Sequence, residues 1–256
     1  MSQDRTHLPQ ELTNHIIDLL HDAPTALKAC ALVSHAFTYA AQSHIFRHIC
    51  IGCRRLMESS DIDRKWFRLQ EKLHTSPHLI RHIHRLEPHS RRMSIETLQA
   101  ICSFPFTHLK HLFTVISPES AMALQQLASL PCLRSLGIRC RFPVMSTFLQ
   151  IWDRCSPHIR HSDLSGYLIL TDTFHAIPHH CSQPIRLESV RIAAVEGVRD
   201  WVNHALCPSD FSGLTGLSIY IHTEVVRWSK FVPVFGRSKS STFLPMCAIS
   251  VSSHIM

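Results

Sequence analysis

The chain has 256 residues, of which 45% are hydrophobic and 18% are charged, and it contains only seven glycines. This hydrophobic fraction is typical of globular proteins and excludes wholesale disorder. So few glycines argue against phosphate-binding loops and hairpin-dense β-sandwiches, because both need residues with positive φ. No uncharged apolar stretch approaches the roughly 20 residues that span a bilayer, and the first residues lack the apolar segment of a secretory signal.

We therefore expect a protein of the cytoplasm or nucleus that makes no contact with a membrane. Cysteines stay reduced in those compartments, so the ten cysteines are interpreted as buried apolar side chains without a disulfide framework. The formal net charge of +7 is unevenly distributed. Residues 1–50 carry three basic and four acidic groups, whereas residues 51–110 carry eleven and six. Attraction for an acidic partner would therefore arise in the middle of the chain.

The first 50 residues predict three short helices. Apolar residues recur at helical spacing in the first of them, at Leu8, Leu12, Ile16, Leu19 and Leu20. A proline is favourable near the start of a helix, as at Pro9, and the helix should end before Pro24. A second helix is expected over 25–33 and a third over 34–46. Helices this short bury little apolar surface, so the module should gain stability from a partner or from docking on the rest of the chain.

The same segment resembles the F-box family. The matching residues are Leu8-Pro9-x-Glu11-Leu12, Ile16-Ile17, Leu19-Leu20, Ala29-Cys30-Ala31-Leu32-Val33-Ser34 and Ile45-Phe46-Arg47. Phe37 stands where the family has a tryptophan, so the aromatic contact is kept with a smaller area. The resemblance implies docking on a Skp-type adaptor, which connects F-box proteins to a cullin–RING ubiquitin ligase.

The resemblance also implies which side chains would meet the adaptor. The residues that match the adaptor-contacting stretch are Leu8, Pro9, Glu11, Leu12, Ile16 and Ile17. Those that would complete or support the interface are Leu20, Leu32, Val33 and Phe37. From the periodicity alone, the same apolar stripe could equally be the core of a helical N-terminal cap. Only the resemblance favours an adaptor site.

A short unit recurs after a helix that is expected over 62–73. Units of the form apolar-x-x-apolar start at residues 80, 109, 133, 159, 187 and 214, at steps of 29, 24, 26, 28 and 27 residues. These steps are typical of leucine-rich repeats. Several units continue with the alternation of a half-buried strand, and helices are expected between them over 95–102, 119–130, 145–153 and 196–206. The Asn or Cys that follows the strand in that family is missing, so an irregular α/β domain is the alternative.

The expected fold class is therefore α+β. A three-helix F-box-like domain would cover residues 1–53 and a linker helix residues 54–75. An irregular α/β solenoid that resembles leucine-rich repeats would cover residues 76–222, followed by an irregular tail over 223–256.

No catalytic or metal site is expected. The chain has no Gly-x-Ser-x-Gly segment, phosphate loop or dinucleotide fingerprint. The sharpest metal candidate joins His44, His48, Cys50 and Cys53, a donor set that tetrahedral zinc accepts. These four residues lie within ten positions, where neighbouring apolar residues must turn inward, so buried cysteines and surface histidines are the favoured interpretation. His179-His180-Cys181 has no second half of a site and is interpreted as a loop.

The basic stretch Arg81-His-Ile-His-Arg85, with Arg91-Arg92, could bind nucleic acid or an acidic substrate. Because no aromatic residues interleave with it, a solvated face is favoured and nucleic-acid binding is not expected. We therefore expect a non-catalytic substrate receptor without a cofactor, in which the repeats hold a protein substrate of unknown identity. The alternative is a repeat scaffold whose N-terminal helices do not bind the adaptor.

Overall fold

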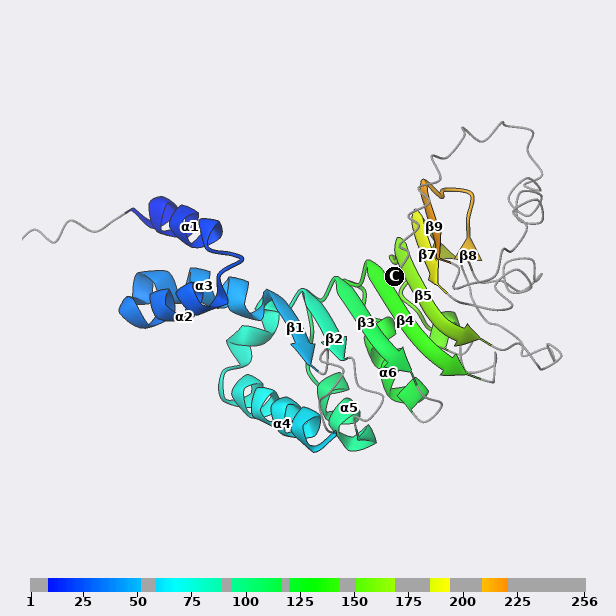
Figure 1. Cartoon of the computed structure of the whole chain (residues 1–256), viewed down its shortest axis with the longest axis horizontal. Coiled ribbons are helices and arrows are strands. Elements are labelled where there is room, and N and C mark those ends of the chain that lie inside the picture. The colour runs from blue at the N-terminus through cyan, green and yellow to red at the C-terminus, as the bar shows by residue number, and fades with distance from the viewer. Residues whose placement is uncertain are drawn as a thin grey trace, which may run out of the picture.

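The structure is a computed structural model of the chain, and it describes residues 9–51, 59–88, 94–116, 120–142, 151–168, 185–193 and 209–220. Within this part of the chain, an N-terminal group of helices stands at one end of a long parallel sheet (Figure 1). The predicted α+β class is confirmed at this level, as a mixture of helices and strands in which helices come first.

Three N-terminal helices form where the hydrophobic spacing predicts them. They are α1 (Gln10–Leu19), α2 (Pro24–Val33) and α3 (His35–Arg47). Pro24 is the first residue of α2, where its missing N–H costs no hydrogen bond. Ser34 is the N-cap of α3, since its hydroxyl accepts a hydrogen bond from the Ala36 N–H at 3.2 Å. Proline and serine therefore separate the helices at the expected positions.

Seven parallel strands form one sheet, and their order in the sheet is their order in the chain (Figure 1). They are β1 (His48–Ile51), β2 (Arg85–Pro88), β3 (His111–Ile116), β4 (Ser135–Phe142), β5 (His161–Leu168), β7 (Ser189–Ala193) and β9 (Gly216–Tyr220). A second, two-stranded parallel sheet pairs β6 (Ile185–Arg186) with β8 (Ser209–Asp210). Parallel neighbours need a crossover segment between them.

Helices α4 (Ser59–Thr75), α5 (Ile95–Cys102) and α6 (Ala121–Ala128) lie on the same face of the large sheet (Figure 1). A short 3₁₀ helix, η1 (Pro77–His82), leads from α4 into β2. The main core fills the space between these helices and the sheet, and it includes Trp66 of α4, Leu136 of β4 and Trp152. Trp152 is fully buried, and its indole N–H donates to the Ser209 hydroxyl at 2.8 Å.

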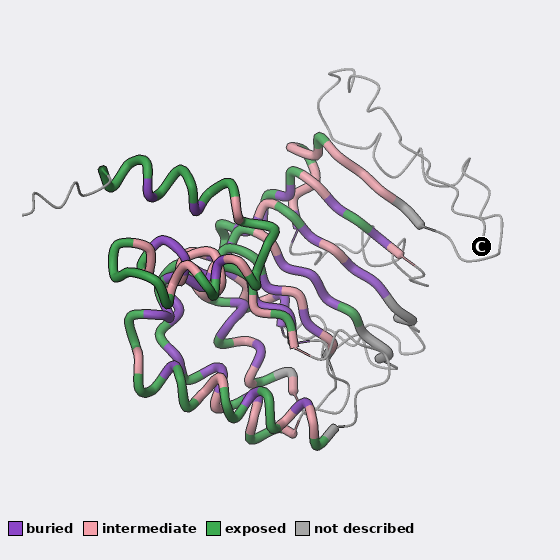
Figure 2. Tube along the Cα trace, turned by 60° about the vertical axis from the view of Figure 1, so that its left-hand side comes forward, coloured by how far each residue is buried: buried purple, intermediate pink, exposed green. Residues whose placement is uncertain are grey.

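The strand register stacks one residue from each unit into a ladder that faces this core. The stacked residues are Ile49, Leu86, Leu112, Leu136, Ser162, Val190 and Leu217. Because successive side chains of a strand point to opposite faces, the residues next to them face away from the helices. Burial accordingly alternates along β1 and β7 (Figure 2).

The register corrects the first repeat unit. The sequence predicts a unit that starts at Ile80 and reaches Ile83, but the structure aligns Ile83 and Leu86 with Leu109 and Leu112. Ile80, Ile83 and Leu86 are spaced by three, so the apolar pattern fits two registers equally well. Ile80 instead lies in η1 and is buried there.

The sheet also begins earlier than predicted, because β1 pairs with β2 although residues 48–51 fall within the expected N-terminal domain over 1–53. Residues 59–75 are helical as expected, but α4 is no free linker. Its residues Ile62, Trp66 and Leu73 are buried in the main core. The described N-terminal module therefore consists of α1, α2 and α3, and the tail predicted over 223–256 lies outside the described residues.

Among the described helices, none combines the length and the hydrophobicity that crossing a membrane requires. Cys102 fits the prediction of buried cysteines, since burial raises the pKa of its thiol to about 12. Cys50 does not fit, because it is exposed on β1 and takes part in a disulfide. An exposed thiol on a strand is accessible for such a bond, unlike one within the core.

Candidate functional site

Helix α1 carries two apolar stripes on adjacent faces. Thr13 and Ile17 are buried and Leu20, just past the helix end, is half-buried, so this stripe packs on the module's core. Leu12, Ile16 and Leu19 form the second stripe at steps of four and three, and they are 50%, 41% and 70% exposed. Residues at these steps lie on one face of a helix. The second stripe therefore faces solvent, and we call it the outer stripe.

The C-terminal end of α2 exposes two further apolar side chains. Leu32 is 89% exposed, the largest value among the exposed large hydrophobic residues of the described part of the chain, and Val33 is 78% exposed. Only Leu27 of α2 is buried. The interior of the module therefore does not use the apolar end of this helix.

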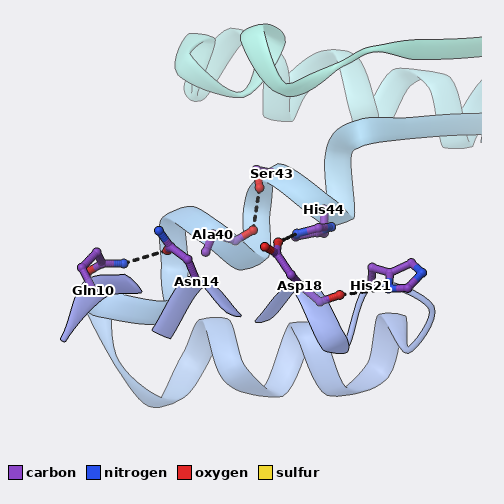
Figure 3. Close-up of polar contacts among 7 residues, drawn as sticks. All are labelled: Gln10, Asn14, Asp18, His21, Ala40, Ser43 and His44. Carbon is purple, nitrogen blue, oxygen red and sulfur yellow. Dashed lines mark hydrogen bonds and ion pairs between the residues drawn. The ribbon is translucent and has the colours of Figure 1, made fainter. Parts of the chain in front are cut away.

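Few residues hold the module together. Its buried apolar residues within the described region are Ile17, Leu27, Ala40 and Ala41. Polar contacts between α1 and α3 supplement them. His44 Nε2 donates to Asp18 Oδ1 at 2.8 Å (Figure 3), and the Gln10 amide donates to the Ala36 carbonyl at 3.4 Å. Thr38 Oγ1 donates to the Ala31 carbonyl at 3.1 Å, which ties α3 to α2. The helices are thus oriented by a small core and by side-chain hydrogen bonds.

The predicted adaptor-contacting residues take three different positions. Leu12, Ile16, Leu32 and Val33 are exposed, as an interface requires, and so are Pro9 and Glu11 at the start of α1. Ile17 is fully buried, whereas Leu20 and Phe37 are half-buried against the same small core. Leu8 lies outside the described residues.

Ile17 therefore supports the surface from beneath and is not available for contact, which differs from the position that the resemblance implies for it. Leu19, by contrast, is missing from the predicted site although it completes the outer stripe. Its spacing of three from Ile16 was the signal in the sequence.

The module is joined to the sheet region through α3. The Tyr39 ring of α3 meets the His82 ring of η1 edge-on, with centroids 5.1 Å apart, and the Arg81 guanidinium lies 5.1 Å from the Tyr39 centroid. The backbone also connects the two regions, because α3 ends at Arg47 and β1 begins at His48. The contact holds the module beside the first strand of the sheet and leaves the outer stripe free.

The predicted metal candidate does not assemble. Among the described residues, no group of histidines, cysteines and acids is close enough to hold a metal ion. His44 binds Asp18, His48 lies 3.2 Å from Glu87 Oε1, and Cys50 is in a disulfide, while Cys53 is not described. The candidate set fails because each described member has another partner.

The described cavity offers no reactive group. It lies between α4 and the sheet, and Trp66, Leu73, Leu86, Phe104 and Phe106 line it. The lining is apolar apart from Gln70, and none of its side chains can serve as acid, base or nucleophile. His179, His180 and Cys181 lie outside the described residues.

The face of the sheet opposite α4, α5 and α6 is a second candidate surface, and polar side chains dominate it. Glu87 pairs with Arg85 and with His48, and Asp163 pairs with Arg191 at 3.7 Å. Burial raises the pKa of Asp163, and the nearby Arg191 and Arg139 counteract this shift in part. Comparisons of the chain with models of known families and with curated proteins found no match. The functional argument therefore depends on these two surfaces.

Proposed function

We propose that the protein is a substrate-recognition subunit of a cullin–RING ubiquitin ligase. Its N-terminal helices would dock a Skp-type adaptor, and the polar face of the sheet would hold a protein substrate. The chain would bind and position, whereas the transfer chemistry would belong to other subunits. The observation that carries the proposal is the outer stripe of Leu12, Ile16 and Leu19.

Exposure of a second apolar stripe has a cost that only a partner offsets. Burial of a leucine or isoleucine side chain stabilises by roughly 1.5–3 kcal/mol, and the outer stripe forgoes part of this in the free chain because its side chains are 41% to 70% exposed. An amphipathic helix that lays such a face into a groove is a common mode of protein recognition. Because Ile17 and Leu27 already fill the inside of the module, the outer stripe has no other role in its packing.

The sheet region supports the leucine-rich-repeat part of the resemblance. Corrected for the first unit, the repeat positions are 83, 109, 133, 159, 187 and 214, at steps of 24 to 28 residues. Each step adds one parallel strand next to the preceding one. Neighbour-to-neighbour stacking of this kind produces an extended surface, which is the form that repeat proteins use to bind partners.

Capture of the chain by an immobilised Skp-type adaptor tests the proposal. The wild-type chain should be retained, and Leu12→Asp together with Ile16→Asp should abolish retention, because a carboxylate buried in an apolar interface costs several kcal/mol. The matched control is Phe67→Asp together with Met122→Asp, which places two carboxylates on exposed apolar positions of α4 and α6. This control should be retained like the wild type.

Thermal unfolding followed by circular dichroism must show that both double variants remain folded. Failure of the wild-type chain to bind, or full retention of the Leu12/Ile16 variant, contradicts the proposal. The first of these outcomes would favour a repeat scaffold that has no role in the ligase.

A further inference from the structure

A row of basic residues crosses the large sheet just before its strands begin. It contains Arg47, His84, Lys110, Arg134 and Arg160, one from each of five successive units, and we call it the basic row. The backbone fixes their alignment, since each N–H donates to the carbonyl of the preceding member. The four distances are 3.0, 2.8, 2.9 and 2.8 Å.

The side chains of the basic row are accessible. Arg47, Lys110 and Arg134 are exposed, while His84 and Arg160 are half-buried. The first strand positions beside the row add more groups of the same kind, namely His48, Arg85, His111 and His161, all of them exposed. The register places these residues at one level of β1, β2, β3 and β5, with Ser135 of β4 between His111 and His161.

Carboxylates near the basic row do not balance its charge. Glu87 is already engaged by Arg85 and His48, and Glu188 lies 3.6 Å from Arg160 at the end of the row. Within the described part of the chain, Arg47, Lys110 and Arg134 form no ion pair. The Arg134 guanidinium donates to the carbonyls of Pro131 and Leu133 at 2.9 and 3.1 Å, which holds the group in place without neutralising it.

The lowered pKa values of His84 and His111 also reflect the positive charges around the basic row. Burial lowers the pKa of His84, and the neighbouring Lys110 and Arg47 lower it further. Burial also lowers the pKa of His111, with further contributions from Arg85, His161 and Lys110. Like charges held this close raise each other's energy, and an anionic partner relieves that repulsion.

From this arrangement we infer that the basic row binds a segment of polypeptide rich in Asp and Glu. The inference rests on the proposed function, because it names the class of substrate segment that the sheet would hold. Neighbouring strands lie about 4.8 Å apart, so the five members of the row span about 19 Å. An extended chain covers that distance with about six residues, so alternate carboxylates can each meet a basic side chain.

A protein segment fits the row better than single-stranded nucleic acid does. Proteins that bind single strands combine a positive groove with aromatic side chains on which the bases stack. The basic row and the strand positions beside it, over the described residues, contain no Phe, Tyr or Trp. The row therefore offers charge without a stacking platform.

Fluorescence anisotropy on the full chain tests the inference, with a fluorescein-labelled peptide of alternating Glu and Ser, about eight residues long. The wild-type chain should bind this peptide and should not bind a peptide with Gln in place of Glu. Lys110→Glu together with Arg134→Glu should weaken binding about tenfold or more, because two exposed attractions become repulsions. The affinity should also fall as salt is added.

The matched control is Arg68→Glu together with Lys72→Glu, which changes the net charge equally on exposed positions of α4. It should bind the acidic peptide like the wild type. Equal binding by the Lys110/Arg134 variant, equal binding of the Gln peptide, or tighter binding of an oligouridylate than of the acidic peptide would overturn the inference.

Adaptor capture repeated on the Lys110/Arg134 variant separates this inference from the proposed function. The variant should still bind the adaptor, because the basic row lies on the sheet and the outer stripe lies on α1. If the wild type binds the peptide but not the adaptor, the inference that the basic row binds an acidic segment holds, and the proposed ligase role is contradicted. Adaptor binding without peptide binding would contradict the inference about the basic row and leave the proposed ligase role in place.

Discussion

The N-terminal module and the sheet region differ in where their large apolar side chains lie. In the module, two of the four buried apolar residues are alanines, while leucines, an isoleucine and a valine face solvent. In the sheet region, one continuous core runs from Ile62 to Ile192, and the opposite face of the sheet carries charged groups. The module thus exposes apolar side chains, whereas the exposed face of the sheet is polar.

This difference also sets the expected stability of the two regions. A small core leaves little free energy to hold α1, α2 and α3 in place, whereas the sheet region shares a core across many strands. We therefore expect local opening of the module below the temperature at which the sheet unfolds. Variants placed in one region or the other test whether the two regions respond separately.

The largest effect is expected from Leu136→Ala in the centre of the sheet. Leu136 is 1% exposed and lies between Leu112 and Ser162 in the ladder. Removal of its side chain should lower the free energy of unfolding by about 2–5 kcal/mol, as a transfer term plus a cavity term. Urea denaturation measures the change, and Leu32→Ala at a highly exposed position is the control, expected within about 0.5 kcal/mol of the wild type.

Ile17→Ala should have a smaller effect that is confined to the module. Ile17 is the largest fully buried side chain of α1, and its loss should cost about 2 kcal/mol. Amide hydrogen exchange should accelerate in α1, α2 and α3 and stay unchanged in β3, β4 and β5. Equal acceleration in these strands would show that the two regions unfold as one unit.

Removal of matched helix caps gives a still smaller effect in each region. Ser34 Oγ accepts from the Ala36 N–H at 3.2 Å in the module, and Ser94 Oγ accepts from the Thr97 N–H at 3.2 Å at the start of α5. Ser34→Ala and Ser94→Ala should each cost about 1 kcal/mol in the helix concerned. Hydrogen exchange should detect the loss in α3 for the first variant and in α5 for the second, and the opposite pattern would contradict the two-region description.

The smallest effect should be a pH dependence at the junction of the two regions. Burial comes first among the causes that lower the pKa of His82, His84 and His111 below the ordinary value of 6.5. Just below pH 6.5 these histidines therefore bind protons more readily in the unfolded chain than in the folded chain. The stability present above pH 6.5 consequently falls as the pH drops below that value. The groups that face these histidines are Tyr39, Arg47, His78, Arg81, Arg85, His108, Lys110 and His161.

Thermal unfolding at about pH 7.5 and about pH 5.5 measures this dependence. His82→Phe keeps an aromatic ring against Tyr39, removes one titrating group and removes a buried Nε2 that has no hydrogen-bond partner within the described structure. The difference in Tm between the two pH values should be smaller in this variant than in the wild type. An unchanged difference would exclude His82 as its source.

The sequence predicted the N-terminal helices well because each boundary has a local chemical cause. Pro24 opens α2 and Ser34 caps α3, and both effects act within a few residues. The same holds for the later strands, where Leu133, Leu187 and Leu214 each precede a strand as expected. Local patterns of this kind are visible without knowledge of the tertiary structure.

Other features could not be read from local patterns. Ile80, Ile83 and Leu86 satisfy two registers, and only pairing with β3 selects one of them. Leu12 and Ile17 are both apolar residues of α1, and only the position of α3 decides that Ile17 is buried while Leu12 is exposed. The basic row unites residues that lie 24 to 37 positions apart, so it exists only once the strands are stacked.

The chain-ordered stacking of the strands has a consequence for how such a molecule forms and changes. Each new strand closes a loop onto its immediate predecessor, so the entropy lost per addition stays nearly constant along the array. Folding can then begin at any pair of neighbouring strands and propagate along the array one strand at a time. By the same reasoning, duplication or loss of one unit would lengthen or shorten the array without rebuilding the rest.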